Sequence, residues 1–165
     1  GYDIVLQAFS ELRKIRGDVV QLVVFGEVIE PEFSLQLDAD GVTWCGFAQP
    51  RALADAYRGA GCFTLMSREE HWGTVVCEAA LCGCPLVLSD CVGASPDLLG
   101  SNGVLVNLSS NSESQTVTDL VAAWITVCDQ TDEAWKKMSL SSVERASHFS
   151  DGLFAKGVIA LDQRK

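Results

Sequence analysis

The sequence predicts an α/β fold: a three-layer, Rossmann-like domain with a parallel sheet covered by helices on both faces. Short runs rich in Val, Leu and Phe recur about every twenty residues, and stretches with helical periodicity separate most of them. Runs that are apolar on both faces are typical of strands buried in a parallel sheet. Strands are expected at residues 21–26, 43–47, 62–67, 85–90 and 103–107.

Helices are expected between these strands and after the last of them. Pro50 stands at a position typical of a helix start, and Gly83 at one typical of a helix end. Trp124 and Trp135 are expected to anchor two C-terminal helices, which a polar loop at 108–115 precedes. The expected helices are 3–16, 50–60, 74–82, 117–128, 131–148 and a short one within 152–165.

Two stretches depart from a regular strand–helix alternation. Residues 27–41 fall where a crossover helix is expected, but Pro31 and an alternating apolar pattern do not favour one. The chain also opens in a helix, whereas a Rossmann half usually opens with a strand. We therefore expect a strand upstream of Gly1 and a longer protein around it.

Composition excludes several classes of function. Twelve Lys and Arg face 22 Asp and Glu, which gives a formal net charge of −10, and nucleic-acid binding needs a surplus of basic side chains. The sequence contains no apolar run near the roughly 20 residues that span a bilayer, and no signal peptide. Seven cysteines in apolar surroundings, spaced unlike a zinc site, favour thiols in a reducing compartment. We expect a cytoplasmic protein without a metal site.

The most informative stretch runs from Ser67 to Asp90. A strand ends at Ser67, and Gly73 and Thr74 then open a helix that carries Glu78, with Thr74 as the candidate N-cap. Free amides at a helix start form an anion site, to which glycine allows close approach. With Glu70 before the helix, the segment offers an anion cradle between two hydroxyl-binding acids. A solvated charge run, a plain turn glycine and helix-start chemistry are the simpler explanations of the same residues.

These residues resemble a known family. Glu70 and Glu78 stand in SREEHWGTVVCEAALCGCPLVLSD, which is similar to the E-x7-E signature of GT-B glycosyltransferases of family 4, the glycosyl transferases group 1. GYDIVLQAF at the start, QLVVFG at 21–26 and Cys45-Gly46-Phe47 resemble further segments of that family. Residues 93–99 and 103–106 do so as well. The resemblance is close over 1–107 and loose beyond.

The resemblance implies a fold, a reaction and a set of roles. The chain 1–165 would be a single nucleotide-sugar-binding, Rossmann-like domain with its core at 1–107 and C-terminal helices at 112–165. It would be the C-terminal, donor-binding half of a retaining glycosyltransferase of the hexosyltransferase type, with an acceptor hydroxyl bound by an N-terminal domain. A UDP-, GDP- or ADP-sugar would be the donor, without a cofactor or metal. Membrane contact of the full enzyme is left open.

Site roles follow position by position from that resemblance. Glu70 would lie at the reaction centre and bind the donor sugar, and Glu78 would bind the ribose hydroxyls. Amides of three residues at the helix start would hold the diphosphate, and the end of the second strand would border the base. The diphosphate-binding residues would be Gly73, Thr74 and Val75, and the base-side residues Gly46 and Phe47.

Several departures keep other functions open. The family's phosphate-binding Arg and Lys precede its first helix and are not found here, and Asp97 stands where a Glu is usual. Arg68 is expected to pair with its acidic neighbours or to reach a phosphate, and Trp72 to be a lid or a domain contact. The alternatives are a GT-B sugar-nucleotide epimerase, a non-catalytic nucleotide-binding module, and an unrelated flavodoxin-like or receiver-like domain. We expect weak nucleotide binding and no sugar transfer by these residues alone.

Overall fold

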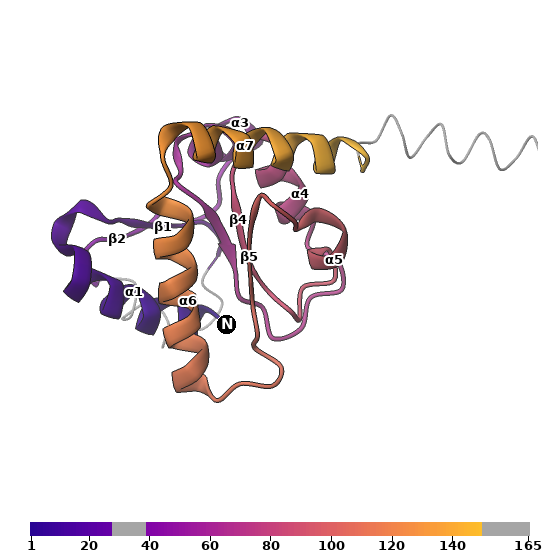
Figure 1. Ribbon diagram of the computed structural model, residues 1–165. Coiled ribbons are helices and arrows are strands. Elements are labelled where there is room, and N and C mark those ends of the chain that lie inside the picture. The colour runs from indigo at the N-terminus through magenta and orange to yellow at the C-terminus, as the bar shows by residue number, and fades with distance from the viewer. Residues whose placement is uncertain (28–38, 150–165) are drawn as a thin grey trace, which may run out of the picture.

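The chain folds into layers of helices around short parallel strands, as a computed structural model shows (Figure 1). The structure describes residues 1–27 and 39–149, so the expected tail helix and most of the irregular segment 27–41 lie outside the described residues. Each of the five expected strand runs contains a strand. They are β1 Leu22–Val24, β2 Val42–Trp44, β3 Phe63–Leu65, β4 Leu86–Ser89 and β5 Gly103–Val106.

The strands pair in two parallel ladders. β1 pairs with β2, and β4 lies between β3 and β5. The sequence predicted one continuous sheet, but among the described residues no strand joins the outer edge of β1 to that of β3. β4 therefore has partners on both sides, while β1 and β3 each keep one unpaired edge.

Burial of the strands follows this pairing. All four residues of β4 are buried, as expected for a strand covered on both faces. β2 is largely exposed, with Trp44 at 45%, so the expectation of burial on both faces is wrong for this strand. The reason is that β2 lies at the rim of a two-stranded ladder, where few helices cover it.

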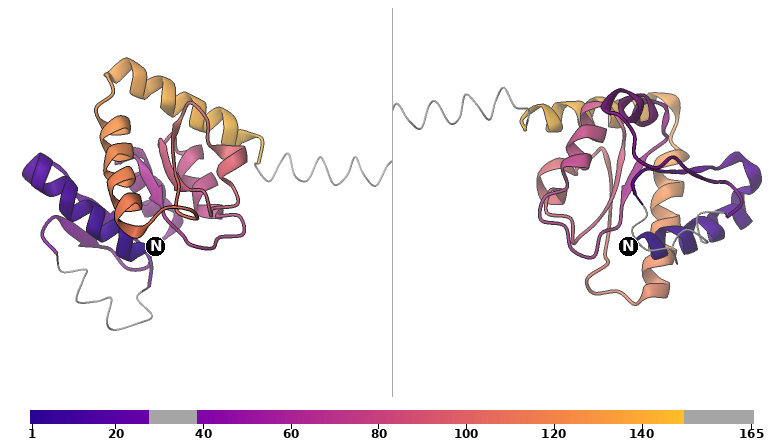
Figure 2. Two further views of the ribbon diagram at one scale, coloured as in Figure 1. Left: turned by 60° about the horizontal axis from the view of Figure 1, so that its bottom comes forward. Right: turned by 180° about the vertical axis from the view of Figure 1, so that it is seen from behind.

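Helices cover both faces of the three-stranded ladder. α1 (Tyr2–Arg16) and α6 (Glu113–Cys128) lie side by side on one face, where Phe9 and Leu120 pack with Val87 of β4. On the other face, Leu86 and Leu88 of the same strand pack with Val76. Figure 2 shows these helix layers from two further directions. The helices of this second face are α3 Pro50–Gly59, α4 Thr74–Leu81, α5 Ser95–Leu98 and α7 Asp132–Ser147.

Local signals explain where the helices start and pack. Pro50 occupies the first turn of α3, and the Ser112 hydroxyl accepts a hydrogen bond from the Gln115 amide at the start of α6. This cap starts α6 four residues earlier than the periodicity predicted, inside the expected polar loop. Trp124 and Trp135 act as the expected anchors, donating through Nε1 to Thr64 Oγ1 (2.8 Å) and to the Gly61 carbonyl (3.0 Å).

None of the described helices combines the length and apolar character needed to cross a membrane. The longest, α6 and α7, have 16 residues each. The short helix α5, which the sequence pattern did not predict, spans only four residues.

Candidate functional site

The loop that carries Glu70 lies at the carboxyl edge of the three-stranded ladder. It follows β3 and runs beside the segment that follows β4, with a parallel bridge between Glu70 and Val92. The Glu70 amide donates to the Cys91 carbonyl (3.3 Å), and the Gly93 amide donates to the Glu70 carbonyl (2.9 Å). These bonds place Glu70 at the edge where parallel α/β sheets bind ligands.

Gly73 is required by the backbone at the start of α4. Its φ of 91° lies in the left-handed region, and it is the N-cap residue. A Cβ at this position would lie 3.2 Å from Val76 Cγ2, 3.3 Å from Val92 Cγ1 and 3.4 Å from Glu70 Cγ. The glycine is buried, so its missing side chain makes room for protein packing as well as for the turn.

Thr74 is the first residue of α4, which corrects the expectation that it caps the helix. The cap is Gly73, and no side chain accepts a hydrogen bond there. Val76 donates its amide to the Gly73 carbonyl (2.8 Å). The amides of Thr74 and Val75 belong to the first turn, where the α-helical pattern supplies no acceptor. The helix start thus presents the unbonded donors of an anion site.

One face of α4 is turned to solvent and carries the remaining predicted residues. Thr74, Val75 and Glu78 are exposed, whereas Val76, Cys77, Ala79 and Ala80 are buried. Residues separated by three or four positions share a helix face. Glu78 therefore lies one turn along the same surface as the two first-turn residues.

The two carboxylates have different surroundings. Glu70 is half-buried, and its Oε1 accepts a long hydrogen bond from the Trp72 amide (3.4 Å). Glu78 is exposed and lies close enough to Tyr57 of α3 to affect its titration. Burial, followed by the charge of Glu78, raises the pKa of Tyr57 to about 12. Tyr57 thus stays a neutral hydroxyl beside Glu78 at any physiological pH.

Gly46 and Phe47 lie at the end of the other ladder. Gly46 has a φ of 62°, and its carbonyl accepts a hydrogen bond from the Gly26 amide (2.9 Å) that ties the ends of β1 and β2 together. The Phe47 side chain is 72% exposed. No hydrogen bond among the described residues joins either residue to Glu70 or to α4.

Arg68 is bound to α1, which the sequence analysis did not expect. Its Nη1 lies 2.7 Å from Asp3 Oδ1, and a second contact makes the pair bidentate. The same pairing holds the pKa of Asp3 well below its usual range. A Cβ on Gly1 would lie 1.6 Å from the Met66 carbonyl oxygen, so α1 starts directly against the end of β3. No spacing signal in the sequence links Asp3 to Arg68.

Trp72 has a ring partner from the far end of the described chain. Its ring lies 5.4 Å from that of Phe149, at an interplanar angle of 53°. The Trp72 carbonyl accepts a hydrogen bond from the Ala94 amide (2.9 Å). Trp72 therefore fixes the loop before Gly73 from two sides, a packing role that the sequence did not indicate.

Asp90 is the residue that directly follows β4. Burial works against its charged form, but hydrogen bonds from the Ser109 hydroxyl and from the amides of Leu108 and Ser109 lower the pKa of Asp90. This carboxylate is saturated by the loop after β5. Asp90 therefore has a structural role: it holds the loop after β5 against the end of β4.

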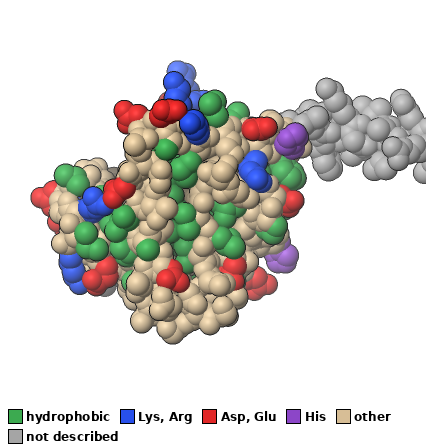
Figure 3. Space-filling model, in the orientation of Figure 1, with side chains coloured by type: hydrophobic (Ala, Val, Ile, Leu, Met, Phe, Trp, Pro, Cys, Tyr) green, Lys and Arg blue, Asp and Glu red, His purple; other side chains and the backbone are tan. Residues whose placement is uncertain are grey.

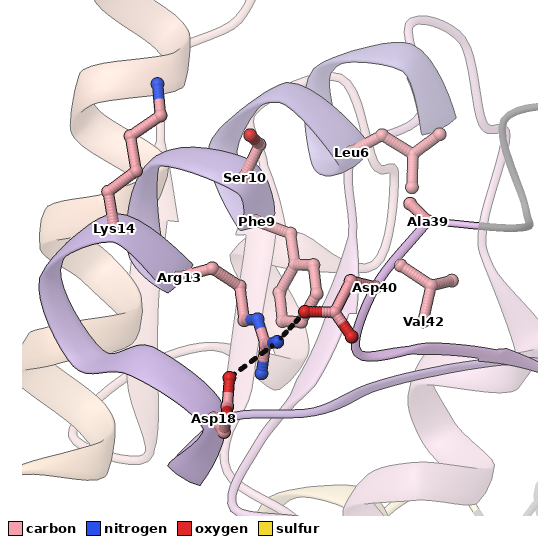
Figure 4. Close-up of a pocket in the computed structure, with 9 residues that line it drawn as sticks. All are labelled: Leu6, Phe9, Ser10, Arg13, Lys14, Asp18, Ala39, Asp40 and Val42. Atoms are coloured by element: carbon pink, nitrogen blue, oxygen red, sulfur yellow. Dashed lines mark hydrogen bonds and ion pairs between the residues drawn. The ribbon is translucent and has the colours of Figure 1, made fainter.

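A pocket of about 410 Å³ lies elsewhere, between α1 and the segment that leads into β2 (Figure 4). Phe9 and Val42 form its apolar side, and Arg13 reaches Asp18 and Asp40 across it. None of the residues predicted for the site lines this pocket. Arg13 forms ion pairs with two carboxylates, so its guanidinium is not available to a phosphate in this pocket.

On the face that Figure 3 shows, the charged side chains of the described residues do not gather into a basic surface. Figure 3 shows acidic and basic groups scattered over one face of the molecule. Within the described residues, no group of three or more His, Cys, Asp or Glu side chains is placed to hold a metal ion. The carboxyl edge therefore offers amides and carboxylates, which suit an anion flanked by hydroxyl groups.

Comparison with known proteins assigns the chain. The sequence profile described as "Glycosyl transferases group 1" matches residues 1–126. The chain belongs to this glycosyltransferase family. A D-inositol 3-phosphate glycosyltransferase of Segniliparus rotundus is 31% identical over 171 aligned residues, which cover 97% of this chain and 36% of that protein. This group 1 chain thus spans about a third of the length of the Segniliparus protein.

Solved structures share the fold of this glycosyltransferase chain. The pneumococcal O-GlcNAc transferase GtfA, in complex with UDP and GlcNAc, superposes with a TM-score of 0.79 at 21% identity and covers 99% of this chain and 33% of its own. Anabaena Alr3699/HepE, in complex with UDP-glucose, superposes with a TM-score of 0.77 at 21% identity and covers 99% and 45%. These enzymes have the GT-B fold, which confirms the expected fold class.

Proposed function

We propose that this chain is the donor-binding part of a retaining hexosyltransferase that moves a sugar from a nucleotide diphosphate to an acceptor hydroxyl. The start of α4 carries this proposal: a glycine-capped helix with unbonded first-turn amides stands at the carboxyl edge, with Glu70 before it and Glu78 on its exposed face. Membership of the glycosyltransferase family supports the reaction class.

The helix start would bind the diphosphate. Amides of Gly73, Thr74 and Val75 point their dipoles at an anion, and the helix dipole adds about half a positive charge at this end. Within the described loop before α4, the one Lys or Arg side chain, Arg68, is bound to Asp3. With a formal net charge of −10, the chain alone would bind a nucleotide sugar weakly.

Glu70 and Glu78 would bind the hydroxyl groups on either side of the diphosphate. Glu78 is exposed beside the helix start and would accept hydrogen bonds from the ribose hydroxyls. Glu70 lies in the preceding loop and would accept them from the sugar, next to the bond that breaks. Gly46 and Phe47, at the end of β2, would border the base.

Transfer would break the bond between the anomeric carbon and the diphosphate oxygen. The diphosphate leaves with the bonding electron pair, the acceptor oxygen bonds the same carbon on the same face, and the acceptor proton passes to the departing diphosphate. Amides fixed at the helix start stabilise the charge that grows on the leaving group, a term that is often the largest in such catalysis. This scheme uses no metal or other cofactor.

The remaining part of a longer enzyme would bind the acceptor. The chain spans 36% of the Segniliparus relative, and GT-B enzymes react between two domains. We therefore propose that residues 1–165 alone do not transfer sugar. UDP-sugars are the first donors to test, because solved relatives hold UDP or UDP-glucose. GDP- and ADP-sugars follow, and a cytoplasmic location is part of the same proposal.

Calorimetric titration with UDP and with UDP-glucose tests the assignment of the two acids. Glu78→Gln should weaken both ligands at least about tenfold, since a hydrogen bond to a charged group contributes about 1.5–3 kcal/mol. Glu70→Gln should weaken UDP-glucose but leave UDP unchanged, because only the sugar would reach it. Glu69→Gln, which alters the exposed neighbour, and Glu144→Gln on α7 serve as matched controls.

Three outcomes would redirect the proposal. Nucleotide binding that survives both substitutions would favour a non-catalytic nucleotide-binding module. Conversion of the sugar–nucleotide by the complete protein, without an acceptor, would favour an epimerase. Robust transfer by residues 1–165 alone, in an assay with several nucleotide sugars, would show that no second half is needed.

A further inference from the structure

Two cysteine thiols meet at the edge of the sheet opposite the candidate donor site. Cys62 immediately precedes β3, and Cys128 is the last residue of α6. Cys62 packs against the core cluster that includes Val127, the neighbour of Cys128, and each thiol is the main influence on the pKa of the other. Cys128 Sγ also lies 3.4 Å from the point that a Cβ on Gly61 would occupy, directly beside Cys62. Two cysteines far apart in sequence thus lie at adjacent positions in the fold.

Other contacts hold these two backbones in place independently of the thiols. The Trp135 ring donates to the Gly61 carbonyl (3.0 Å), and the Trp124 ring donates to Thr64 Oγ1 (2.8 Å). Arg16 of α1 pairs with Asp129, the residue after Cys128. Because the start of β3 and the end of α6 are already fixed in the folded chain, a bond between the two sulfur atoms would require little rearrangement of the fold.

The two thiols differ in access and in acidity. Cys128 is exposed and Cys62 is half-buried. The hydrogen bond from Cys62 lowers the pKa of Cys128 to about 7. The same hydrogen bond, together with burial, raises the pKa of Cys62. The exposed member is thus the better nucleophile near neutral pH, because thiolates rather than thiols attack disulfides.

We propose that Cys62 and Cys128 form a thiol-modification site that low-molecular-weight disulfides oxidise to an intramolecular disulfide. In the first step Cys128 attacks one sulfur of the small disulfide, which forms a mixed disulfide and releases one small thiol. Cys62 then attacks the Cys128 sulfur, forms the Cys62–Cys128 bond and releases the second small thiol. The two thiol protons leave with those products, and the two electrons reduce the small disulfide.

The order of these steps follows from the environment of each sulfur. Cys62 gives its hydrogen bond to Cys128 while Cys128 is the thiolate. Once Cys128 carries the small thiol, the main cause of the raised pKa of Cys62 is removed. Cys62 then acts as the resolving thiol. Buried Cys84, whose pKa burial raises to about 12, is expected to stay unreactive on this time scale.

Oxidised glutathione provides the test, with the reduced 165-residue chain at pH 7.5 and mass spectrometry after alkylation. We expect two alkylatable thiols to disappear and one cross-linked peptide pair, Cys62 with Cys128. The rate should rise with pH across the region near 7. The melting temperature of the oxidised chain should increase by several degrees, because the cross-link closes a long loop.

Single variants separate the two roles. Cys62→Ser should accumulate a glutathione adduct on Cys128 without a cross-link, and Cys128→Ser should react at Cys62 at least tenfold more slowly. Cys45→Ser removes another exposed thiol and should still form the cross-link. A wild-type chain that forms no cross-link, forms it through other cysteines, or is alkylated no faster at Cys128 than at Cys45 would overturn the proposal, whether or not the variants fold.

Discussion

At the scale of single residues, the candidate site depends on a backbone conformation and close contacts at position 73 that favour glycine. Gly73 combines a positive φ with three close neighbours, one of them the side chain of Glu70. The residue that turns the chain into α4 therefore also positions a predicted catalytic acid. A motif glycine here links local backbone geometry to the site directly.

Replacement of this glycine is expected to cost stability. Gly73→Ala should lower the free energy of unfolding by about 1–2 kcal/mol, because alanine resists the left-handed conformation and its Cβ crowds Val76 and Val92. Urea unfolding followed by circular dichroism measures the change. Gly59→Ala at the end of α3 is the control: a Cβ there meets nothing within 4 Å, so stability should stay the same or rise.

The pair between Asp3 and Arg68 gives a pH-dependent contribution. Arg68 lowers the pKa of Asp3 in the folded chain, so the pair stabilises the fold above the ordinary carboxyl pKa of about 4. Both side chains are partly exposed, at 34% and 52%, and exposed pairs contribute about 0.2–1 kcal/mol. Asp3→Asn should thus lose up to about 1 kcal/mol at pH 7.

Unfolding at several pH values checks this sign. The difference between wild type and Asp3→Asn should shrink as pH falls from about 4 through the lower native pKa of Asp3. Glu144→Gln, which removes an exposed carboxylate with no ion pair among the described residues, should show no such trend. A gap between Asp3→Asn and wild type that persists unchanged at pH 2 would contradict the assignment.

At the scale of elements, the two C-terminal helices begin differently from the helix that carries the candidate site. α6 and α7 start with hydroxyl caps, from Ser112 and Thr131. α4 starts at a glycine with no side-chain cap. A capped helix start satisfies its amides internally, whereas an uncapped start leaves them for a ligand. The element proposed for anion binding thus starts without a side-chain acceptor, a feature it shares with α1, α3 and α5.

Removal of a structural cap is expected to have a measurable effect. Ser112→Ala should lower the free energy of unfolding by about 1 kcal/mol, since the hydroxyl accepts a hydrogen bond from the Gln115 amide. The urea midpoint should fall while the dependence on urea concentration stays constant. Ser110→Ala, two positions earlier, removes a hydroxyl with no hydrogen bond among the described residues and should change little. Equal effects of the two substitutions would refute the capping role.

At the scale of the whole molecule, stability is expected to concentrate around β4. This strand is paired on both sides, and its alternate residues enter the two core clusters. β1 and β3 each have an unpaired edge. Leu22 and Gly26 donate toward β2, to the carbonyls of Gly41 and Gly46 (2.9 Å each). The alternation of a strand directs the Val23 and Phe25 amides to the opposite, unpaired edge.

Hydrogen exchange measured by NMR on the 165-residue chain tests this distribution. Amides of Leu86 to Leu88 should exchange slowest, through global unfolding. Val23 and Phe25 should exchange at least tenfold faster than Leu22 and Gly26, because only the latter pair donates within the ladder. Equal protection on both edges of β1 would show that a further partner covers it.

The sequence by itself determined the class of fold and most of the elements. Periodicity and breakers placed the five strand runs and the helices on both sides of them, because local side-chain patterns express burial that is regular along the chain. Family motifs located the loop after β3 and the start of α4 as the candidate site. The turn at Gly73 and the close packing around it both follow from one missing Cβ.

Only the tertiary structure decided which distant residues meet. It bonded Arg68 to Asp3, packed Trp72 against Phe149 at a tilt, brought Cys62 close to Cys128 and left two ladders in place of one sheet. It also moved the cap of α4 from Thr74 to Gly73. Such contacts depend on how helices and strands pack in three dimensions, and no periodicity along a chain records the partner of an individual side chain.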